Sequence, residues 1–403
     1  MALVDIEVGL TEQELAVADT VHKFAEEVMR PAGVELDRLA DPADIKRPDS
    51  VLWDVFKRHR ELGLDDPLDT ADTELGPVEQ ARMRCIINEE LGWGDSGLAI
   101  SLGVAGMHKM FSQMSGRQEL IERYCQPGCE EIGCWAITEP DHGSDTLACS
   151  EPHFTDPAVK ANRIARRDGD EYVIRGQKAA WVSNGTIATV AALFCTIDGD
   201  QGFKGGGVAV VPLDLPGVSR GKPLDKIGQR ALDQGEIFFD DVRIPVEHMI
   251  VGKELYGVVI EAVLTTANAF MGTTFVGVAR AALEHAIAYA KERVQGGVPI
   301  IEHQSVKARL FKMFSQVEAA RSLARRVVVY NSLNPPGLVQ YSIASKTFAT
   351  NTAFEVASAA LQIYGGNGLS REYPIEKLMR DARASMIEDG CNEILSLVGA
   401  SRL

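Results

Sequence analysis

The spacing of apolar and polar residues divides the chain into three parts with different periodicities. Across residues 11–114 apolar side chains recur at helical spacing, and Thr11 with Glu14 forms the signature of a capping box. The first helix is predicted to end at about Met29, since Pro31 lacks the backbone N–H that a helix interior needs. Further helices are predicted at 51–62 and 78–91, with Gly63 ending the first of them and Gly76-Pro77 opening the second.

Across residues 131–251 the periodicity changes to two, which is typical of strands. Turn residues such as Asp168-Gly169-Asp170 separate these strands, and no helix of crossover length intervenes. We therefore expect a compact β domain of antiparallel character. The pattern marks strands at 172–174, 190–195, 208–211 and 237–239.

From residue 255 onward the chain is rich in alanine, with apolar residues at three- and four-residue steps. Short links containing Gly and Pro separate four long helices, which is typical of a bundle. The predicted fold class is mainly α with a central β domain. It comprises an N-terminal α-helical domain at 1–130, a middle antiparallel, barrel-like β domain at 131–251 and a C-terminal four-helix bundle at 252–403. The four helices are predicted at 258–293, 303–330, 338–364 and 373–397.

Composition narrows the classes of partner. The formal net charge of −16 over 403 residues argues against nucleic acid and anionic membrane surfaces. No uninterrupted apolar run approaches the length of a membrane span. The seven cysteines lack a second ligand pair at zinc spacing, so no metal site is predicted. Their odd number and an N-terminus without signal-peptide character favour a reducing, cytoplasmic location.

The most informative segment is 135–145, in which a short apolar run leads into a turn with a Gly-Ser-Asp end. Gly143 permits positive φ, so backbone N–H groups there can face a planar or anionic ligand. Thr138 and Ser144 add neutral hydrogen-bond donors. These residues predict either a ligand cradle between a strand and a loop or a tight surface turn.

Segment 135–145 resembles the flavin and substrate segment of the acyl-CoA dehydrogenase family, and later motifs resemble that family in the same order. The resemblance implies an FAD cofactor and the same succession of helical, β and helical domains. By resemblance, the residues of this segment that bind the cofactor are Trp135, Ile137, Thr138, Gly143 and Ser144, and Ser144 also contacts the substrate.

Segment 176–185 resembles the second flavin strand of the family. There an aromatic residue lies near the isoalloxazine and a hydroxyl two residues later bonds its N5 edge. Trp181 and Ser183 occupy those places, although the run from Lys178 to Trp181 is one residue longer than in many members. An ordinary hairpin with a buried tryptophan is the alternative.

Further resemblance lies in the predicted bundle. Arg293 follows the first long helix, and a guanidinium suits a diphosphate because its fork bonds two oxygens at once. The alternative is a solvated arginine that complements the helix dipole. Two adjacent glycines let backbone approach a ligand closely. The resemblance assigns Arg293, Gln362, Gly365 and Gly366 to FAD bound across subunits, and Gln304 to the cofactor. It implies a homo-oligomer, a tetramer built as a dimer of dimers.

Segment 380–394 decides the predicted chemistry. In the family, the acidic residue directly before its glycine abstracts the α-proton of the acyl thioester. An ungapped count from Arg380 puts Asp389, before Gly390, in that place, and Glu388 in the place of an aromatic. Asp is shorter than the usual Glu, which sets the carboxylate back by roughly 1 Å. Glu388 is the alternative base, and both acids could instead cap or solvate the helix end. The resemblance assigns Cys391 and Glu393 to the cofactor and Gly390 to the substrate.

Three more residues are assigned to substrate binding. By count back from Gly277, Asn268 stands where many family members carry an arginine. Asp95 and Ser96 lie in a Gly-rich turn that falls near the acyl pocket of the family. Asp95 is interpreted either as a second acid facing a polar or cyclic acyl group or as a helix cap.

The resemblance therefore predicts α,β-dehydrogenation of an acyl-CoA thioester, with electrons passing from FAD to an electron-transfer flavoprotein. Two alternatives stay open. One is a flavin oxidase on the same fold, of the acyl-CoA or nitroalkane oxidase type, and the other is a non-catalytic flavoprotein homologue. Nitroalkane oxidases use Asp as base, which fits Asp389, but carry an arginine where this chain has Ser396. The sequence does not determine the acyl group, or CoA rather than a carrier-protein thioester.

Overall fold

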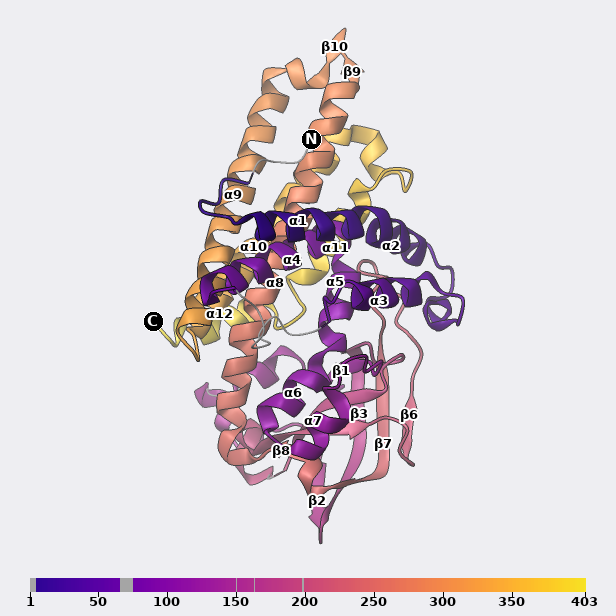
Figure 1. Cartoon of the computed structure of the whole chain (residues 1–403), viewed down its shortest axis with the longest axis vertical. Coiled ribbons are helices and arrows are strands. Elements are labelled where there is room, and N and C mark those ends of the chain that lie inside the picture. Colours follow the sequence, from indigo (N-terminus) through magenta and orange to yellow (C-terminus); the bar gives the residue numbers. More distant parts are fainter. Residues whose placement is uncertain (1–4, 66–74, 150, 163, 198) are drawn as a thin grey trace.

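The computed structural model describes residues 5–65, 75–149, 151–162, 164–197 and 199–403 (Figure 1). Helices come first, a sheet follows and long helices end the chain, as the sequence predicts. The capping box is confirmed, since the Glu14 N–H donates to Thr11 Oγ1 at 3.2 Å and the Thr11 N–H donates to Glu14 Oε2 at 2.8 Å. The helices before the sheet are α1 (Glu12–Phe24), α2 (Arg30–Asp37), α3 (Val51–Glu61), α4 (Pro77–Gly94), α5 (Ser96–Ala105), α6 (Met107–Ser115) and α7 (Gln118–Tyr124).

Pro31 does not end the first helix, contrary to the prediction. A π-helical turn at Ala25–Met29 joins α1 to α2, and Pro31 lies in the first turn of α2. The Arg30 N–H donates to the Ala25 carbonyl, five residues back, so the helix widens just before the proline ring. A proline at this point is tolerated because the widened turn accommodates its missing N–H. The chain therefore stays helical through Asp37.

The central sheet has eight strands in the order β6-β7-β3-β1-β4-β5-β8, and β2 pairs with both β3 and β4. This double pairing closes part of the sheet into the predicted barrel-like form. The sheet is mixed rather than antiparallel throughout, because β1 and β2 each run parallel to β4. The chain between β1 and β4 contains β2 and β3, and this long connection replaces a crossover helix. The strands are β1 (Gly133–Ala136), β2 (Ile164–Asp168), β3 (Glu171–Ser183), β4 (Val190–Thr196), β5 (Gly206–Pro212), β6 (Val218–Arg220), β7 (Gln234–Pro245) and β8 (Met249–Val251).

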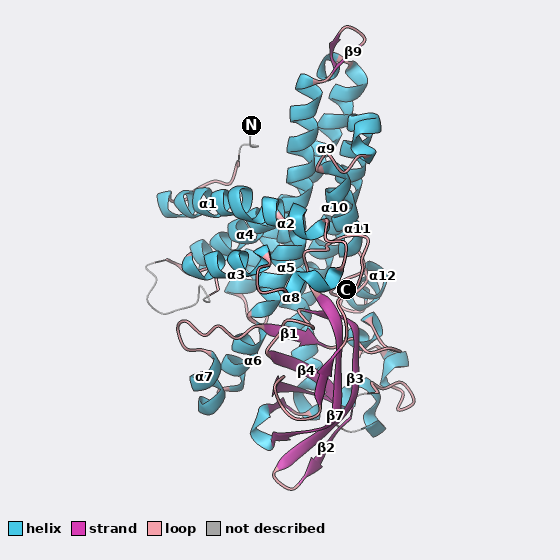
Figure 2. Ribbon diagram, turned by 90° about the vertical axis from the view of Figure 1, so that its right-hand side faces the viewer, coloured by secondary structure: helices cyan, strands magenta, loops and turns pink. Residues whose placement is uncertain are grey.

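Helix α8 begins beside the sheet and extends beyond it, and the β9–β10 hairpin joins α8 to α9 at the far end of the molecule (Figures 1 and 2). The predicted last helix at 373–397 is in fact two helices, α11 and α12, with residues 386–391 between them. Asp389 has a φ of 50° and Gly390 a φ of 91°, which a right-handed helix cannot contain. The elements of this part are α8 (Lys253–Glu292), β9 (Val294–Gln295), β10 (Val298–Pro299), α9 (Gln304–Leu333), α10 (Val339–Tyr364), α11 (Ile375–Ser385) and α12 (Asn392–Ala400).

Helix α8 is the central helix of the bundle and packs against α4, α9 and α10. Among the described helices it alone is long and apolar enough, by length and composition, to cross a membrane. Half of that apolar window is buried inside the protein, which is what a core helix of a bundle requires.

Helices α4 and α8 cross in direct backbone contact. A Cβ atom on Gly92 of α4 would lie 2.0 Å from the carbonyl oxygen of Thr274. A Cβ on Gly277 of α8 would likewise lie 2.0 Å from the carbonyl oxygen of Glu89. Any larger side chain at either glycine would push the helices apart.

A buried ion cluster fixes the same crossing. Glu89 of α4 is 2% exposed and accepts hydrogen bonds from Arg280 of α8 at 2.7 Å and from Arg321 and Arg325 of α9 at 2.9 and 3.2 Å. Burial alone would raise the pKa of Glu89, but the three guanidinium groups lower it to about 2. The carboxylate therefore stays charged at neutral pH and joins three helices.

Replacing Glu89 by Gln should lower the free energy of unfolding by about 3–5 kcal/mol, because three buried guanidinium groups would lose their shared counter-charge. Chemical denaturation measures the loss. Glu35, which is exposed on α2, provides the control, and Glu35→Gln should change stability by less than about 0.5 kcal/mol. Equal stability of the two variants would show that the cluster does not hold the helices together.

Candidate active site

Segments far apart in the sequence enclose one cavity of about 440 Å³. They include the loop after β1, the end of β3, the loop between β6 and β7, and the loop between α11 and α12. The cavity thus has walls from the sheet and from the C-terminal helices, which lie directly above the sheet in Figure 2. The predicted site residues that line it are Trp135, Ile137, Thr138, Gly143, Ser144, Trp181, Ser183, Glu388, Asp389 and Gly390.

A buried ion pair holds the loop after β1 against β3. Lys178 is 1% exposed, and its Nζ donates to Glu139 Oε1 at 2.7 Å and to the Ile137 carbonyl at 2.9 Å. The same loop is tied again where the Ala179 N–H donates to the Thr138 carbonyl at 2.9 Å. This segment is therefore a fixed cavity wall and not the plain surface turn that the sequence left as an alternative.

Two predicted hydroxyls are oriented by protein donors. The Cys391 N–H donates to Ser144 Oγ at 2.9 Å, and the Gln234 Nε2 donates to Ser183 Oγ at 3.2 Å. Because each oxygen already accepts a hydrogen bond, its own hydrogen can be offered to a ligand acceptor in the cavity.

The extra length of the run before Trp181 appears as a bulge in β3. Lys178 pairs with Ile237 and Val182 pairs with Gly235, so the β3 strand has more residues than β7 over this stretch. Trp181 lies in the bulge and is 57% exposed. The alternative of a buried tryptophan in an ordinary hairpin is therefore wrong.

The acid pair lies on the loop between α11 and α12. Beneath this loop Lys346 of α10 is fully buried, and its Nζ donates to the Gly390 carbonyl and to Asn392 Oδ1, both at 2.8 Å. The lysine pins the loop from inside and places a positive charge near Asp389 and Glu388.

The two acids titrate differently. Burial raises the pKa of Asp389 to about 6, although the charge on Lys346 opposes the rise. Burial and the neighbouring Asp389 raise the pKa of Glu388 to about 8. Burial thus raises both pKa values, that of Glu388 further, so Asp389 gives up its proton at a lower pH than its neighbour.

Several cavity residues were not predicted from the sequence. Gln229 and Lys226 come from the loop between β6 and β7, and Gln229 has a φ of 49°. Lys226 Nζ donates to Gln234 Oε1 at 2.8 Å and to the Leu232 carbonyl at 2.7 Å, and burial lowers its pKa to about 8. Gly228 is the residue in this loop whose type could have indicated a close contact. A Cβ atom there would lie 2.3 Å from the carbonyl oxygen of Arg380.

A second group of predicted residues lies away from the cavity, around one end of the bundle. The Tyr289 ring of α8 stacks on Tyr364 of α10 with centroids 4.0 Å apart, so the ends of these helices are neighbours. Gly365 has a φ of 60°, and a Cβ on it or on Gly366 would meet no atom within 4 Å, so this turn is open to a ligand. The predicted residues outside the cavity at these helix ends are Arg293, Gln304, Gln362, Gly365 and Gly366.

Asp95 serves as a helix cap. Its Oδ1 accepts the Leu98 N–H at 2.9 Å at the start of α5, and its Oδ2 lies 2.5 Å from Lys377 Nζ. The side chain is 4% exposed and does not line the cavity. Both carboxylate oxygens are therefore engaged inside the protein.

The other predicted residues lie near the cavity or behind it. Ser96 is 2% exposed beside Asp95. Asn268 is fully buried in α8, and its Nδ2 donates to the Leu264 carbonyl at 3.0 Å. Cys391 does not line the cavity, but its N–H bonds Ser144, which does. Glu393 is exposed in the first turn of α12.

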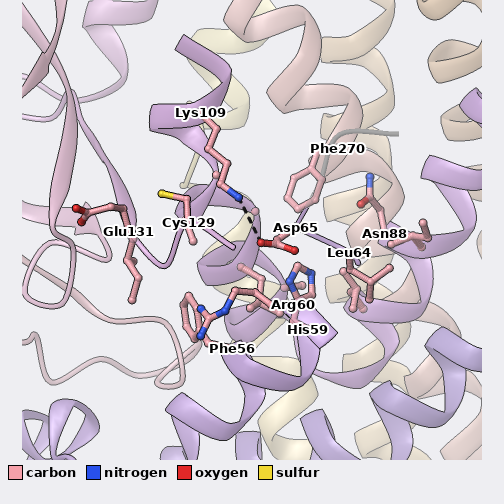
Figure 3. Close-up of a pocket in the computed structure, with 18 residues that line it drawn as sticks. Phe56, His59, Arg60, Leu64, Asp65, Asn88, Lys109, Cys129, Glu131 and Phe270 are labelled. Atoms are coloured by element: carbon pink, nitrogen blue, oxygen red, sulfur yellow. Dashed lines mark hydrogen bonds and ion pairs between the residues drawn. The ribbon is translucent and has the colours of Figure 1, made fainter. Parts of the chain in front are cut away.

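A smaller cavity of about 250 Å³ lies among α3, α4, α5 and α6 and contains none of the predicted residues (Figure 3). Lys109 Nζ lies 3.3 Å from Asp65 Oδ2 in its wall, and burial lowers the pKa of His59 to about 4. Across the described ranges of the chain, no group of three or more His, Cys, Asp or Glu side chains is placed to hold a metal ion.

Known proteins share this architecture. Residues 134–242 match the acyl-CoA dehydrogenase middle domain, and residues 257–403 match the acyl-CoA dehydrogenase C-terminal domain. The chain is 32% identical over 398 residues to the cyclohex-1-ene-1-carbonyl-CoA dehydrogenase of Geobacter metallireducens, a match covering 96% of this chain and 97% of that protein. The structure of butyryl-CoA dehydrogenase from Megasphaera elsdenii has a TM-score of 0.84 at 27% identity and covers 98% of this chain and 99% of that one.

A third match, to a chain in the structure of the electron transferring flavoprotein of Acidaminococcus fermentans, has a TM-score of 0.84 at 26% identity and covers 98% of both chains. These matches identify the class of protein as an oxidoreductase of the flavoprotein type. The chain belongs to the acyl-CoA dehydrogenase family and is an enzyme of that kind.

Asp389→Val should lower the free energy of unfolding by about 1–2 kcal/mol, because a β-branched residue is strained at positive φ. Asp389→Asn has the same shape and tolerates this conformation, so its stability should stay close to that of the wild type. Urea denaturation of the two variants compares them. Equal losses in both would mean that the carboxylate, and not the backbone conformation, decides stability here.

Proposed function

We propose that this enzyme carries out FAD-dependent α,β-dehydrogenation of an acyl-CoA thioester, with Asp389 as the catalytic base. The observation that supports this most is that the Asp389 carboxylate and two oriented hydroxyls line the same cavity. A carboxylate can accept an α-proton only if it is deprotonated, desolvated and within reach of the acyl group. Asp389 lines the cavity, and its pKa of about 6 would leave it largely deprotonated at neutral pH.

The chemistry of the cavity fits a flavin. Trp135 and Trp181 offer broad apolar walls for a planar ring. The Ser144 and Ser183 hydroxyls keep a hydrogen for the nitrogen and oxygen acceptors along a flavin edge. Together with Thr138 these residues would hold the isoalloxazine, which when bound accepts the β-hydride of the acyl group.

The residues of this chain would remove the α-proton and keep water out of the cavity. Asp389 takes the α-proton, and burial strengthens it as a base by raising its pKa to about 6. Lys346 keeps the loop in place through the Gly390 carbonyl and limits that rise. Trp181, the acyl group and the loop exclude water, so the carboxylate is not resolvated during the transfer.

We further propose that the functional unit contains at least two copies of the chain. Arg293, Gln362, Gly365 and Gly366 lie at helix ends outside the cavity, so they would reach the diphosphate and adenosine of FAD held by a neighbouring subunit. In a dimer each copy would receive the helix ends of its neighbour, and the proposed assembly is a dimer of two such dimers. Electron-transfer flavoprotein is the proposed acceptor of the electrons.

Asp389→Asn should lower the rate of anaerobic flavin reduction by acyl-CoA by about 10²–10⁴-fold, because the base is removed. Glu388→Gln should cost far less. In the wild type, kcat/KM should fall as the pH drops below about 6, because protonated Asp389 cannot accept a proton. Stopped-flow absorbance of the flavin measures the reduction rates of both variants and the pH dependence of the wild type.

Full activity of Asp389→Asn together with loss in Glu388→Gln would identify Glu388 as the base. Peroxide formed in air at the rate of substrate oxidation would favour an oxidase of the acyl-CoA or nitroalkane type. No reduction by any acyl-CoA would favour a non-catalytic flavoprotein homologue.

Arg293→Ala should lose FAD while Lys291→Ala, at an exposed position of the same helix end, should keep it. A mixture of subunits tests whether Arg293 acts across the interface. Arg293→Ala paired with Asp389→Asn in one assembly should regain activity, because one site then combines an intact acid with an intact arginine. Flavin absorbance and turnover of co-expressed variants measure this, and an inactive mixture would put Arg293 in its own subunit's site.

A further inference from the structure

Glu388 lines the cavity and is held there by a hydrogen bond from another loop. Its Oε1 lies 2.5 Å from Gln229 Nε2, while Oε2 has no hydrogen-bond partner among the described residues. The side chain lines the cavity next to Asp389. One oxygen of the carboxyl group is thus bonded by protein, while the residue lines the cavity that an acyl group would enter.

Gln229 is held in place by its own buried contacts, which fix its position relative to Glu388. Its backbone N–H donates to Asp381 Oδ1 at 2.5 Å, and its side-chain Nε2 also approaches the Asp381 carbonyl at 3.4 Å. The residue is 2% exposed and has a φ of 49°, which for glutamine persists only where the surroundings impose it. Glu388 and Gln229 therefore form a preset polar pair, drawn from two different parts of the chain.

Burial and Asp389 favour the protonated form of Glu388, while the hydrogen bond from Gln229 and two lysines oppose it. Asp389 on the same loop repels a second negative charge, while Lys346 from α10 and Lys226 from the loop between β6 and β7 attract one. Burial outweighs the attraction, so the carboxyl group is protonated at neutral pH. It can then donate through its O–H and accept through its other lone pairs.

An unbranched apolar acyl group would cover this half-satisfied carboxyl group without replacing the hydrogen bond that water makes to it. A substrate carboxylate would face the negative charge of Asp389. A hydroxyl can accept a hydrogen bond from the Glu388 carboxyl group without bringing a charge, so it suits the pair better than either. Sites built to bond a hydroxyl discriminate strongly against analogues that lack it.

We propose that Glu388, positioned by Gln229, determines specificity by selecting acyl thioesters that carry a hydroxyl on the carbons beyond the α-carbon. The inference rests on the proposed dehydrogenation at this cavity. Asp389 remains the base, and Glu388 acts on recognition and not on the proton that is removed.

Substrate pairs of matched shape test the proposal. 4-Hydroxybutyryl-CoA is compared with pentanoyl-CoA, and 3-hydroxybutyryl-CoA with 3-methylbutyryl-CoA, so that a hydroxyl replaces a methyl group. The FAD-loaded wild type should favour the hydroxyl member of at least one pair by about 10-fold or more in kcat/KM. Glu388→Leu should abolish or reverse the preference mainly through KM. Glu388→Gln, whose amide still donates and accepts, should retain it, which a purely structural role would not require.

Binding separates this inference from the proposed function. In FAD-loaded Asp389→Asn, which has no base, the dissociation constants of each pair are measured by titration calorimetry. Tighter binding of the hydroxyl member by this variant supports the inference. Failure of every acyl-CoA to reduce the flavin of the wild type would refute the dehydrogenation, but it would not affect that result. Equal binding within both pairs, or a preference unchanged in Glu388→Leu, would overturn the inference while leaving the dehydrogenation standing.

Discussion

The contact between α4 and α8 is the constraint on which the rest of the structure depends. Gly92 and Gly277 bring the two backbones together, and the buried carboxylate of Glu89 binds three arginines across the same crossing. Glycines alone would permit close approach without specifying it. The charge cluster supplies the specificity, since Glu89 has counter-charges only when α4, α8 and α9 meet in this one arrangement.

That crossing in turn determines where the acid loop can lie. Helix α10 packs along α8 and carries Lys346 to the underside of the loop, where its Nζ bonds the Gly390 carbonyl. A buried lysine is costly unless it is fully bonded, and here its partners are the carbonyl and the Asn392 amide oxygen next to the acids. The same group that stabilises the loop therefore also moderates the pKa of Asp389.

Apart from Cys391 and Glu393, the residues assigned to the cofactor by sequence fall into two sets that one chain does not bring together. One set lines the cavity between the sheet and the acid loop, and the other lies where α8, α9 and α10 begin or end near the β9–β10 hairpin. A ligand as long as a dinucleotide offers a physical reason for such a division, because its ring and its diphosphate can be held by different surfaces. The proposed assembly of two or more copies follows from that geometry.

Local chemistry explains what the sequence by itself determined. The helical and strand periods, the Thr11 capping box and the segment from Trp135 to Asp145 depend on residues close together in the chain. Their prediction therefore needed no knowledge of distant contacts, and the order of helices, sheet and helices followed from them. The family resemblance rested on the same short segments.

Only the tertiary structure decided the features that depend on distant residues. The helix continues through Pro31 because a π-turn precedes it, and β1 lies parallel to β4 because β2 and β3 intervene. The loop at Asp389 replaces a predicted helix, since Lys346, more than forty positions earlier in the chain, holds it open. The different protonation of Asp389 and Glu388 was equally inaccessible from sequence, because burial and charges from other elements set both pKa values.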